Sequence, residues 1–209
     1  MIRNRIDHLL SPDTHAGSSG TYSVRSLYFD DYQNSCFYEN ENGTDPREKF
    51  RIRIYNGSAD RIMLECKRKE RGKTQKTTCP LNREQTLTLM QGKCLPDTEK
   101  APQLLRKLTL QMQTRRLRPV VIVEYDRIPY VCPNGNVRVT LDTNISASRA
   151  ISEFLEAQIP KRPVLARGQQ LLEVKYDGFL PVYVFQSLQL GNLRQTAFSK
   201  YYICRKYIR

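Results

Sequence analysis

The sequence is poor in the residues that build zinc sites and disulfide frameworks. Its six cysteines are dispersed without a Cys-x-x-Cys pair, and neither of its two histidines, His8 and His15, lies near a cysteine in the sequence. This spacing excludes the common zinc and disulfide patterns, so we expect reduced thiols and neither kind of site.

Long hydrophobic runs are also missing. No apolar stretch approaches the roughly 20 residues of a membrane-spanning helix. The N-terminal segment 1–10 is too charged for a secretory signal, and the chain has no internal repeat, low-complexity tract or break in composition. We therefore predict a soluble, cytoplasmic protein with a single domain over residues 1–209.

The charge of the chain is strongly one-sided. Its 34 lysines and arginines outnumber its 21 aspartates and glutamates, which gives a formal net charge of +13 at pH 7. Such a balance favours an anionic partner, which could be nucleic acid, polyphosphate, a nucleotide or a membrane surface. Net charge alone does not choose among these.

Four short runs alternate charged and apolar residues: Phe50–Tyr55, Met63–Lys69, Val137–Asp142 and Leu171–Asp177. Successive side chains of a strand point to opposite faces, so charged residues of each run share one face. Any single antiparallel strand can show this pattern because its outer face meets water. Agreement among four strands favours an ordered, functional surface.

Cations and carboxylates occur together on these charged faces. The pairs and triplets are Glu65 with Lys67, Arg138 with Thr140 and Asp142, and Glu173 with Lys175, beside Arg51 and Arg53. Basic side chains bind phosphate oxygens, while carboxylates hold Mg²⁺ or Mn²⁺. The pattern therefore predicts a site for a polyanion and its metal ion.

The same reading gives an α+β fold with a largely antiparallel sheet. We expect helices at 1–10, 32–40, 83–90, 102–115 and 197–207, and strands at 22–31, 47–55, 61–70, 71–81, 119–130, 137–142 and 171–177. Asn82 is the expected cap of the third helix, and 151–167, which contains two prolines, is expected to be a mobile surface linker. Closure of the sheet into a barrel would give its charged face a wet interior.

Seven stretches in this order resemble one family over nearly the whole chain: SLYFD at 26–30, REKFRIRIYN at 47–56, LECKRK at 64–69, RPVVIVEYDRIPY at 118–130, NVRVTLD at 136–142, LLEVKYDGFLP at 171–181 and TAFSKY at 196–201. The chain resembles the VTC domain, the polyphosphate polymerase domain of the vacuolar transporter chaperone complex and its bacterial relatives. These belong to the CYTH-like triphosphate tunnel metalloenzymes. The resemblance implies a closed antiparallel tunnel of about eight strands with flanking helices.

The resemblance also implies roles for individual residues. The positions that match phosphate-binding groups, or share their strand faces, are Arg51, Arg53, Lys67, Lys76, Arg127, Arg138, Lys175, Ser199 and Lys200. Glu173 matches the metal-holding carboxylate, Glu65 occupies the equivalent Glu-x-Lys place on its own strand, and Asp142 shares these faces. The implied cofactor is Mn²⁺ or Mg²⁺, and Arg25 has no assigned role.

One departure concerns the N-terminus. Family members usually begin with a further strand that carries a glutamate and a lysine, whereas Met1 of this sequence falls inside the first expected helix. Three explanations are open: the sequence starts late, it was cut, or the protein lacks one wall of the tunnel. The last would leave an open sheet edge and admit water, so we expect the 209-residue chain to bind triphosphate or polyphosphate but to turn over poorly.

The function implied is metal-dependent phosphoryl transfer, with a nucleoside triphosphate such as ATP and polyphosphate as partners. A polyphosphate polymerase is the first hypothesis. A triphosphatase or polyphosphatase uses water as acceptor in the same site, and a catalytically silent sensor would only bind polyphosphate or inositol polyphosphate. Specific nucleic-acid binding is disfavoured because Glu65 and Glu173 lie among the cations. A membrane-associated partner is left open by the basic C-terminal helix.

Overall fold

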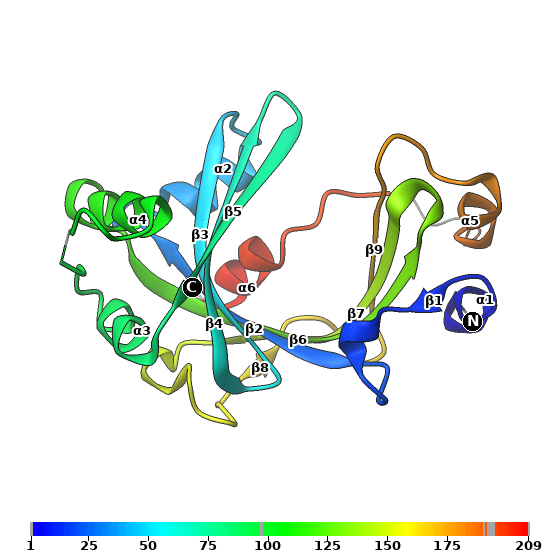
Figure 1. The fold of residues 1–209 in the computed structure, drawn as a ribbon, viewed down its shortest axis with the longest axis horizontal. Helices are drawn as coiled ribbons and strands as arrows, with labels where there is room; N and C mark the ends of the chain where they lie inside the picture. Colours follow the sequence, from blue (N-terminus) through cyan, green and yellow to red (C-terminus); the bar gives the residue numbers. More distant parts are fainter. Residues whose placement is uncertain (1, 97, 190, 192–194, 209) are drawn as a thin grey trace. The chain divides into compact units, whose positions relative to one another are not determined.

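The computed structural model describes residues 2–96, 98–189, 191 and 195–208, and these contain six α-helices and nine strands (Figure 1). They divide into two compact units. Unit 1 comprises the described residues of Met1–Ser23, Tyr125–Asn144 and Leu165–Phe198, and unit 2 those of Val24–Glu124, Ile145–Val164 and Ser199–Arg209. The expected single domain stays a prediction, and the expectation about a missing first strand concerns positions outside the described residues.

The strands form one antiparallel sheet with the order β5-β4-β3-β2-β6-β7-β8, to which β1 adds beside β6 and β9 beside β7. Their bounds are β1 Ser11–Pro12, β2 Tyr22–Asp30, β3 Arg47–Tyr55, β4 Ser58–Glu70, β5 Lys73–Leu81, β6 Arg118–Cys132, β7 Val137–Ser148, β8 Arg162–Pro163 and β9 Leu171–Lys175. The α+β class and the large antiparallel sheet are thus confirmed. Among the described residues the hydrogen-bonded path does not return from β8 to β5, so the closed tunnel stays a prediction.

Two tight turns fix the register of β3, β4 and β5 in unit 2. Asn56 and Gly57 join β3 to β4 with φ of 54° and 64°, the left-handed pair that a two-residue Asn-Gly hairpin turn requires. A Cβ on Gly57 would lie 3.0 Å from the carbonyl oxygen of Ala157, so glycine also suits the packing there. Arg71 and Gly72 make the second turn in the same way.

The core of unit 2 lies between the apolar face of these strands and helices α3 (Arg83–Met90) and α4 (Gln103–Thr114). Leu104, Leu105, Leu108 and Met112 of α4 are buried in that core, whereas Leu110 is exposed. The predicted Asn82 cap is confirmed as well: its Oδ1 accepts from the Gln85 amide at 2.8 Å, and Gln85 returns the bond.

The expectation of a mobile linker over 151–167 is wrong for residues 151–164. A short 3₁₀ helix at Ile151–Glu153 leads to Phe154, which is fully buried in the core of unit 2. Buried Arg25 donates to the carbonyl oxygens of Phe154, Glu156 and Ala157. Pro163 lies within strand β8 and pairs with Ser146 of β7, so this part of the segment belongs to the sheet.

Helix α2 (Ser35–Glu41) begins three residues later than predicted because Asp30 and Asp31 act at its start. Asp30 Oδ1 accepts from the Cys36 amide and Asp31 Oδ1 from the Ser35 amide, each at 2.9 Å. Asn34 precedes the helix with φ of 59°. In the same unit α6 (Lys200–Ile208) replaces the longer helix predicted over 197–207.

Unit 1 has its own smaller core. Ile6 of α1 (Ile2–Asp7) and Val184 of α5 (Val182–Ser187) pack against the apolar face of β7 and against Tyr130 of β6. Helix α1 ends earlier than predicted, and its chain continues into β1, which pairs with Tyr130 and Val131. Position 1, which belongs to the first predicted helix, and position 190 lie outside the described residues.

In the described part of the chain, no helix is both long and apolar enough to cross a membrane.

Candidate functional site

Glu65 is the centre of a charge cluster in unit 2. Its Oε2 accepts from Arg51 Nε at 2.7 Å and lies 2.6 Å from Arg51 Nη2 and 3.7 Å from Arg53 Nη1. Lys76 Nζ lies 2.7 Å from Oε1. The carboxylate is only 3% exposed, so one buried anion holds three cations in place.

The strand register explains why these residues meet. Arg51 pairs with Glu65 across β3 and β4, and Lys67 pairs with Lys49 on one side and with Lys76 on the other. Directly opposed like charges destabilise a sheet, so three lysines in adjacent register favour an anionic ligand over a purely structural role. We call Lys49, Lys67 and Lys76 the lysine rung.

Lys49 is the partly buried member of the lysine rung. Its Nζ donates to Asn40 Oδ1 at 2.5 Å and lies 5.0 Å from the centroid of the Tyr201 ring. Burial is the largest cause that lowers the pKa of Lys49 to about 8, and the charges of Arg47 and Lys67 lower it further. A phosphate beside this ammonium would reverse those effects and restore the full charge.

Burial by itself would raise the pKa of Glu65, but the charges of Arg53 and Arg51 outweigh it and hold the pKa at about 2. The group is therefore ionised throughout the neutral range. Since both carboxylate oxygens contact cations, Glu65 is placed to fix the arginines. A metal ion bound at Glu65 would have to compete with them.

Strand β2 supplies a second layer of polar contacts to the arginines. Tyr28 Oη accepts from Arg51 Nη1 at 2.9 Å, and Ser26 Oγ accepts from Arg53 Nε at 3.1 Å. Burial raises the pKa of Tyr28, but the charges of Arg51 and Arg53 outweigh it and leave the pKa lowered. Tyr28 thus touches the cluster directly.

The start of α6 is held in the same unit. Tyr201 donates its hydroxyl to buried Asp30, and its ring lies 5.1 Å from that of Tyr28. Ser199 Oγ accepts from the Tyr202 amide at 3.3 Å, which is a cap of the helix, and Lys200 is its first residue. The charge of Lys200 is one of the causes that lower the pKa of Tyr28. Lys200 therefore belongs to the unit 2 cluster.

Unit 1 carries a second cluster around Arg127. Its Nε and Nη2 donate to the two oxygens of fully buried Asp142 at 2.7 and 2.8 Å, a bidentate pair. Arg127 Nη2 also lies 3.5 Å from Glu173 Oε2, and Lys175 Nζ lies 3.0 Å from Glu173 Oε1. Burial would lower the pKa of Arg127, but the hydrogen bond to Asp142 leaves it raised. The guanidinium is permanently charged and fixed.

Arg138 is fixed by a different set of partners. Its Nη2 lies 3.0 Å from Asp13 Oδ2 and donates to Tyr22 Oη at 3.2 Å. The Asp13 carboxylate also accepts from the His15 amide. Burial raises the pKa of Asp13, but the bonds from His15 and the charge of Arg138 leave it lowered.

The donor chemistry of unit 1 fits a hard divalent cation at one residue. Asp142 places both its oxygens on Arg127, whereas the Glu173 side chain is 35% exposed at the edge strand β9. No group of three or more His, Cys, Asp or Glu residues in the described ranges is arranged to hold a metal ion. Mg²⁺ and Mn²⁺ are commonly bound by one or two carboxylates together with substrate phosphates and water, so Glu173 suits this mode.

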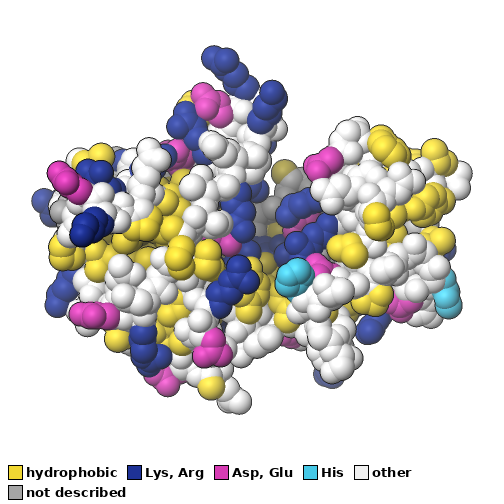
Figure 2. Space-filling model, in the orientation of Figure 1, with side chains coloured by type: hydrophobic (Ala, Val, Ile, Leu, Met, Phe, Trp, Pro, Cys, Tyr) yellow, Lys and Arg dark blue, Asp and Glu magenta, His cyan; other side chains and the backbone are white. Residues whose placement is uncertain are grey.

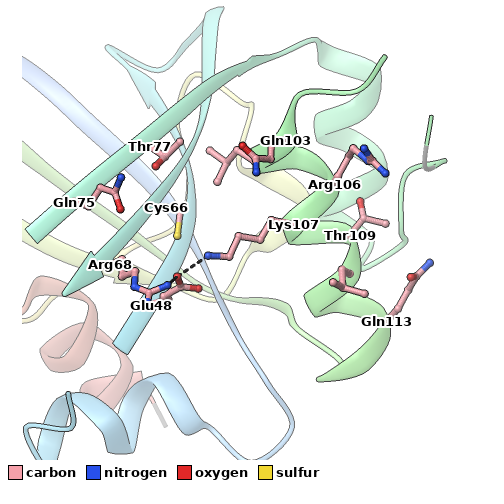
Figure 3. Close-up of a pocket in the computed structure, with 12 residues that line it drawn as sticks. Glu48, Cys66, Arg68, Gln75, Thr77, Gln103, Arg106, Lys107, Thr109 and Gln113 are labelled. Atoms are coloured by element: carbon pink, nitrogen blue, oxygen red, sulfur yellow. Dashed lines mark hydrogen bonds and ion pairs between the residues drawn. The ribbon is translucent and has the colours of Figure 1, made fainter. Parts of the chain in front are cut away.

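A separate pocket of about 460 Å³ lies between α4 and the opposite face of β3–β5 (Figure 3). Lys107 reaches from α4 to Glu48 at 2.5 Å, and Arg68 Nη1 lies 3.4 Å from the same carboxylate oxygen. Since Glu48 and Arg68 alternate with Arg51 and Lys67 along their strands, this pocket and the clusters above occupy different faces. In Figure 2, Lys and Arg side chains gather along the arm formed by β4 and β5.

A family model for the VTC domain matches residues 1–209. The chain belongs to the VTC domain family. A search of curated proteins found no match.

Solved structures with a similar fold include a candidate adenylate cyclase from Bacillus halodurans, at 12% identity and a TM-score of 0.50 over 89% of this VTC domain and 78% of that chain. A protein of Pyrococcus horikoshii OT3 follows at 12% identity and a TM-score of 0.43, over 89% and 77% of the two chains. A candidate adenylyl cyclase from Hippeastrum, described with a dominant triphosphatase activity, has 14% identity and a TM-score of 0.35 over 61% and 60%. The first likeness shows the fold alone.

The structure brings the predicted residues of this VTC domain together in two sets. Unit 2 holds Arg51, Arg53, Glu65, Lys67, Lys76, Ser199 and Lys200, and unit 1 holds Arg127, Arg138, Asp142, Glu173 and Lys175. Their roles toward phosphate and metal stay predictions.

Sequence reasoning missed several members of these clusters. Lys49 shares the Arg51 and Arg53 face of β3, so alternation could have found it. Ser26, Tyr28 and Asp30 are the alternate positions of the SLYFD stretch and carried the same signal. Asp13 carried none, because it lies in a loop whose contact with Arg138 depends on tertiary structure.

Proposed function

We propose that this VTC domain is a metal-dependent phosphotransferase that uses a nucleoside triphosphate, ATP in the first instance, to extend a polyphosphate chain. The observation that carries the proposal is the Glu65 cluster with its neighbouring lysine rung. Arg51 and Arg53 are oriented by a buried carboxylate and a second layer of hydroxyls, as a preorganised phosphate site requires. Membership of the VTC family supports the same reaction class.

Phosphoryl transfer needs mainly positioning and charge stabilisation, because its transition state is loose and spreads negative charge over the phosphoryl oxygens. Arg51 and Arg53 would bind phosphate oxygens in unit 2, and Arg127 and Arg138 would bind phosphate oxygens in unit 1. Each is held before the ligand arrives, so little reorganisation is needed during the reaction. A general base from a Ser-His-Asp or Cys-His device is not part of the proposal.

Glu173 would hold the metal ion, together with phosphate oxygens and water. When bound, Mn²⁺ or Mg²⁺ supplies positive charge that neutralises the phosphate oxygens. Asp142 and Glu65 would act on the arginines instead, since both are buried and accept from guanidinium groups at 2.7–2.8 Å, whereas Glu173 is partly exposed and lies 3.5 Å from Arg127. Asp142 and Glu65 are thus proposed as positioning residues.

The length of the basic row favours a polymer over a short ligand. Arg47, Lys49, Arg51 and Arg53 share one face of β3, and this row extends about 20 Å at the usual rise of a strand. On β4, Lys67 and Lys69 stand opposite its first half. A triphosphate would contact only part of such a row, whereas a polyphosphate chain could contact all of it.

The test incubates the purified chain with ATP and Mn²⁺, with Mg²⁺, and with EDTA, and resolves ADP, orthophosphate and long chains. The proposal expects metal-dependent ADP and long polyphosphate, lost in Arg53→Ala and retained in Arg83→Ala, an exposed arginine on α3. Orthophosphate without chains would replace polymerase by triphosphatase. Binding of polyphosphate without any turnover would identify a non-catalytic binder.

A further inference from the structure

Two unpaired polar atoms lie on the charged face of β7. Among the described residues, Arg138 Nε and Thr140 Oγ1 are buried side-chain atoms without a hydrogen-bond partner. Residues two apart on a strand share a face, so both atoms lie on the side that carries Asp142. Buried donors are nearly always paired in folded proteins, and an unpaired one calls for an explanation.

The surroundings of Thr140 identify the chemistry that could satisfy it. Thr140 stands directly opposite Glu173 in the β7–β9 register, and Arg138 stands opposite Lys175. The opposite face of the strand is apolar, because Val139 and Leu141 are buried in the unit 1 core. Threonine at position 140 therefore places a hydroxyl among two cations and the proposed metal-holding carboxylate.

A core role for this hydroxyl is not supported. Thr140 is only 3% exposed, and in such a setting an unpaired hydroxyl costs stability that valine, of nearly the same shape, would not. Thr86, a fully buried threonine of unit 2, shows the ordinary arrangement: its Oγ1 donates to the Asn82 carbonyl oxygen at 2.8 Å. Thr140 differs from it in having no such partner.

We propose that the Thr140 hydroxyl, with Arg138 Nε–H, donates to an oxygen of a bound phosphate group and so forms a phosphate subsite beside Glu173. This rests on the proposed function, and it adds Thr140 to the residues that bind the substrate. Both donors lack partners in the ligand-free chain, and a phosphate offers several acceptor oxygens to two donors on adjacent same-face positions.

Lys175, which stands opposite Arg138 in the register, is an exposed neighbour of the subsite. Its side chain is 64% exposed, and exposed side chains change rotamer within nanoseconds. Arg138 stays in place because Asp13 and Tyr22 hold its Nη2, so a phosphate would meet the Thr140 hydroxyl and the Arg138 Nε–H in one arrangement.

The experiment measures tripolyphosphate affinity without metal, by calorimetry in EDTA, together with the free energy of unfolding without ligand. Thr140→Val should bind about tenfold or more weakly, as expected for a lost bond to a charged group, while its unfolding free energy stays equal or rises. Thr140→Ser keeps the hydroxyl and should bind like the unchanged chain. Thr86→Val is the control, which should lose stability and keep its affinity.

Five outcomes separate the possibilities. Weak binding by Thr140→Val with retained stability supports the subsite. Unchanged affinity in Thr140→Val overturns it, as does a loss of stability equal to that of Thr86→Val. A change confined to the Mn²⁺ dependence also overturns it, because the hydroxyl would then serve Glu173. Absence of tripolyphosphate binding by the unchanged chain would instead contradict the proposed function.

Discussion

Removal of the charge of Glu65 should destabilise the protein in a pH-dependent way. Glu65→Gln keeps the shape of the side chain but leaves Arg51, Arg53 and Lys76 without their shared anion. The pKa of Glu65 lies at about 2 against an ordinary value of 4.5. At about 1.4 kcal/mol per pH unit, this difference corresponds to about 3 kcal/mol of folding free energy near neutral pH.

The direction of the pH effect follows from the lowered pKa. A carboxylate with a lowered pKa in the folded state contributes its full stability above its unfolded pKa of about 4.5 and loses it as the pH falls toward 2. The difference between the unchanged chain and Glu65→Gln should therefore be about 3 kcal/mol at pH 7 and smaller by about 1.4 kcal/mol at pH 3.5.

The assay is urea unfolding at pH 7, 5 and 3.5. Glu70→Gln is the control on the same strand, because the Glu70 side chain is 44% exposed and forms an ion pair with partly exposed Arg68 at 2.9 Å. It should change the unfolding free energy by less than about 0.5 kcal/mol. Two results would refute the reasoning: a loss below 1 kcal/mol at pH 7 for Glu65→Gln, or an equal loss at pH 7 and 3.5.

Arg53→Ala should weaken tripolyphosphate binding by about 2–4 kcal/mol, because the lost contact is charge-assisted and buried. Titration calorimetry measures it, and a similar loss in exposed Arg83→Ala would contradict a localised site. Glu173→Gln should remove the stimulation of ADP release by Mn²⁺ while metal-free tripolyphosphate binding persists. Exposed Asp177→Asn is the control and should keep that stimulation. Equal stimulation in the two variants would place the metal site elsewhere. Arg25→Met should lower the unfolding free energy by about 3–5 kcal/mol, measured in urea, since it leaves buried Glu124 with Lys161 as its cation and removes the donor to the carbonyl oxygens of residues 154, 156 and 157. An unaffected stability would show that the Arg25 contacts are not structural.

The alternation of charge along the strands predicted most of the unit 2 cluster. Arg51 and Glu65 were placed on one face from periodicity alone, and a hairpin at Asn56 and Gly57 then set them opposite each other. Periodicity predicts which face of a strand a side chain lies on, but its contact across the sheet also depends on the strand register. The turn residues fix that register. Local sequence therefore carried this part of the site.

Long-range partners were beyond such reasoning. Arg25 shares a strand face with Leu27 and Phe29, which predicts an awkward charge in the core but not its partner. That partner, Glu124, lies 99 positions away. Arg25 also donates to backbone carbonyl oxygens at 154, 156 and 157. A side-chain pattern in the sequence does not predict which backbone carbonyl will accept a hydrogen bond. The predicted linker was wrong for the same reason.

Strand β7 shows a further limit of periodicity. The prediction ended it at Asp142, its last charged residue, yet the strand continues to Ser148, and Ser146 and Ala147 pair with β8. Ile145–Ser148 still alternate apolar and small polar residues, but this segment is buried on both faces. A search for alternating charge therefore stops before a segment that is covered on both sides.

The carboxylate of Glu65 competes with any anionic ligand for the cations of the unit 2 cluster. The Glu65 carboxylate already contacts Arg51, Arg53 and Lys76. A phosphate that binds one of these cations must displace this carboxylate or share the cation with it. Orthophosphate brings little more charge than it replaces, whereas a linear polyphosphate brings many charges at once and can reach the lysine rung as well. We therefore expect the resident carboxylate to set a minimum charge density for ligands, so that the chain remains selective for polyanions in a solution rich in small phosphates.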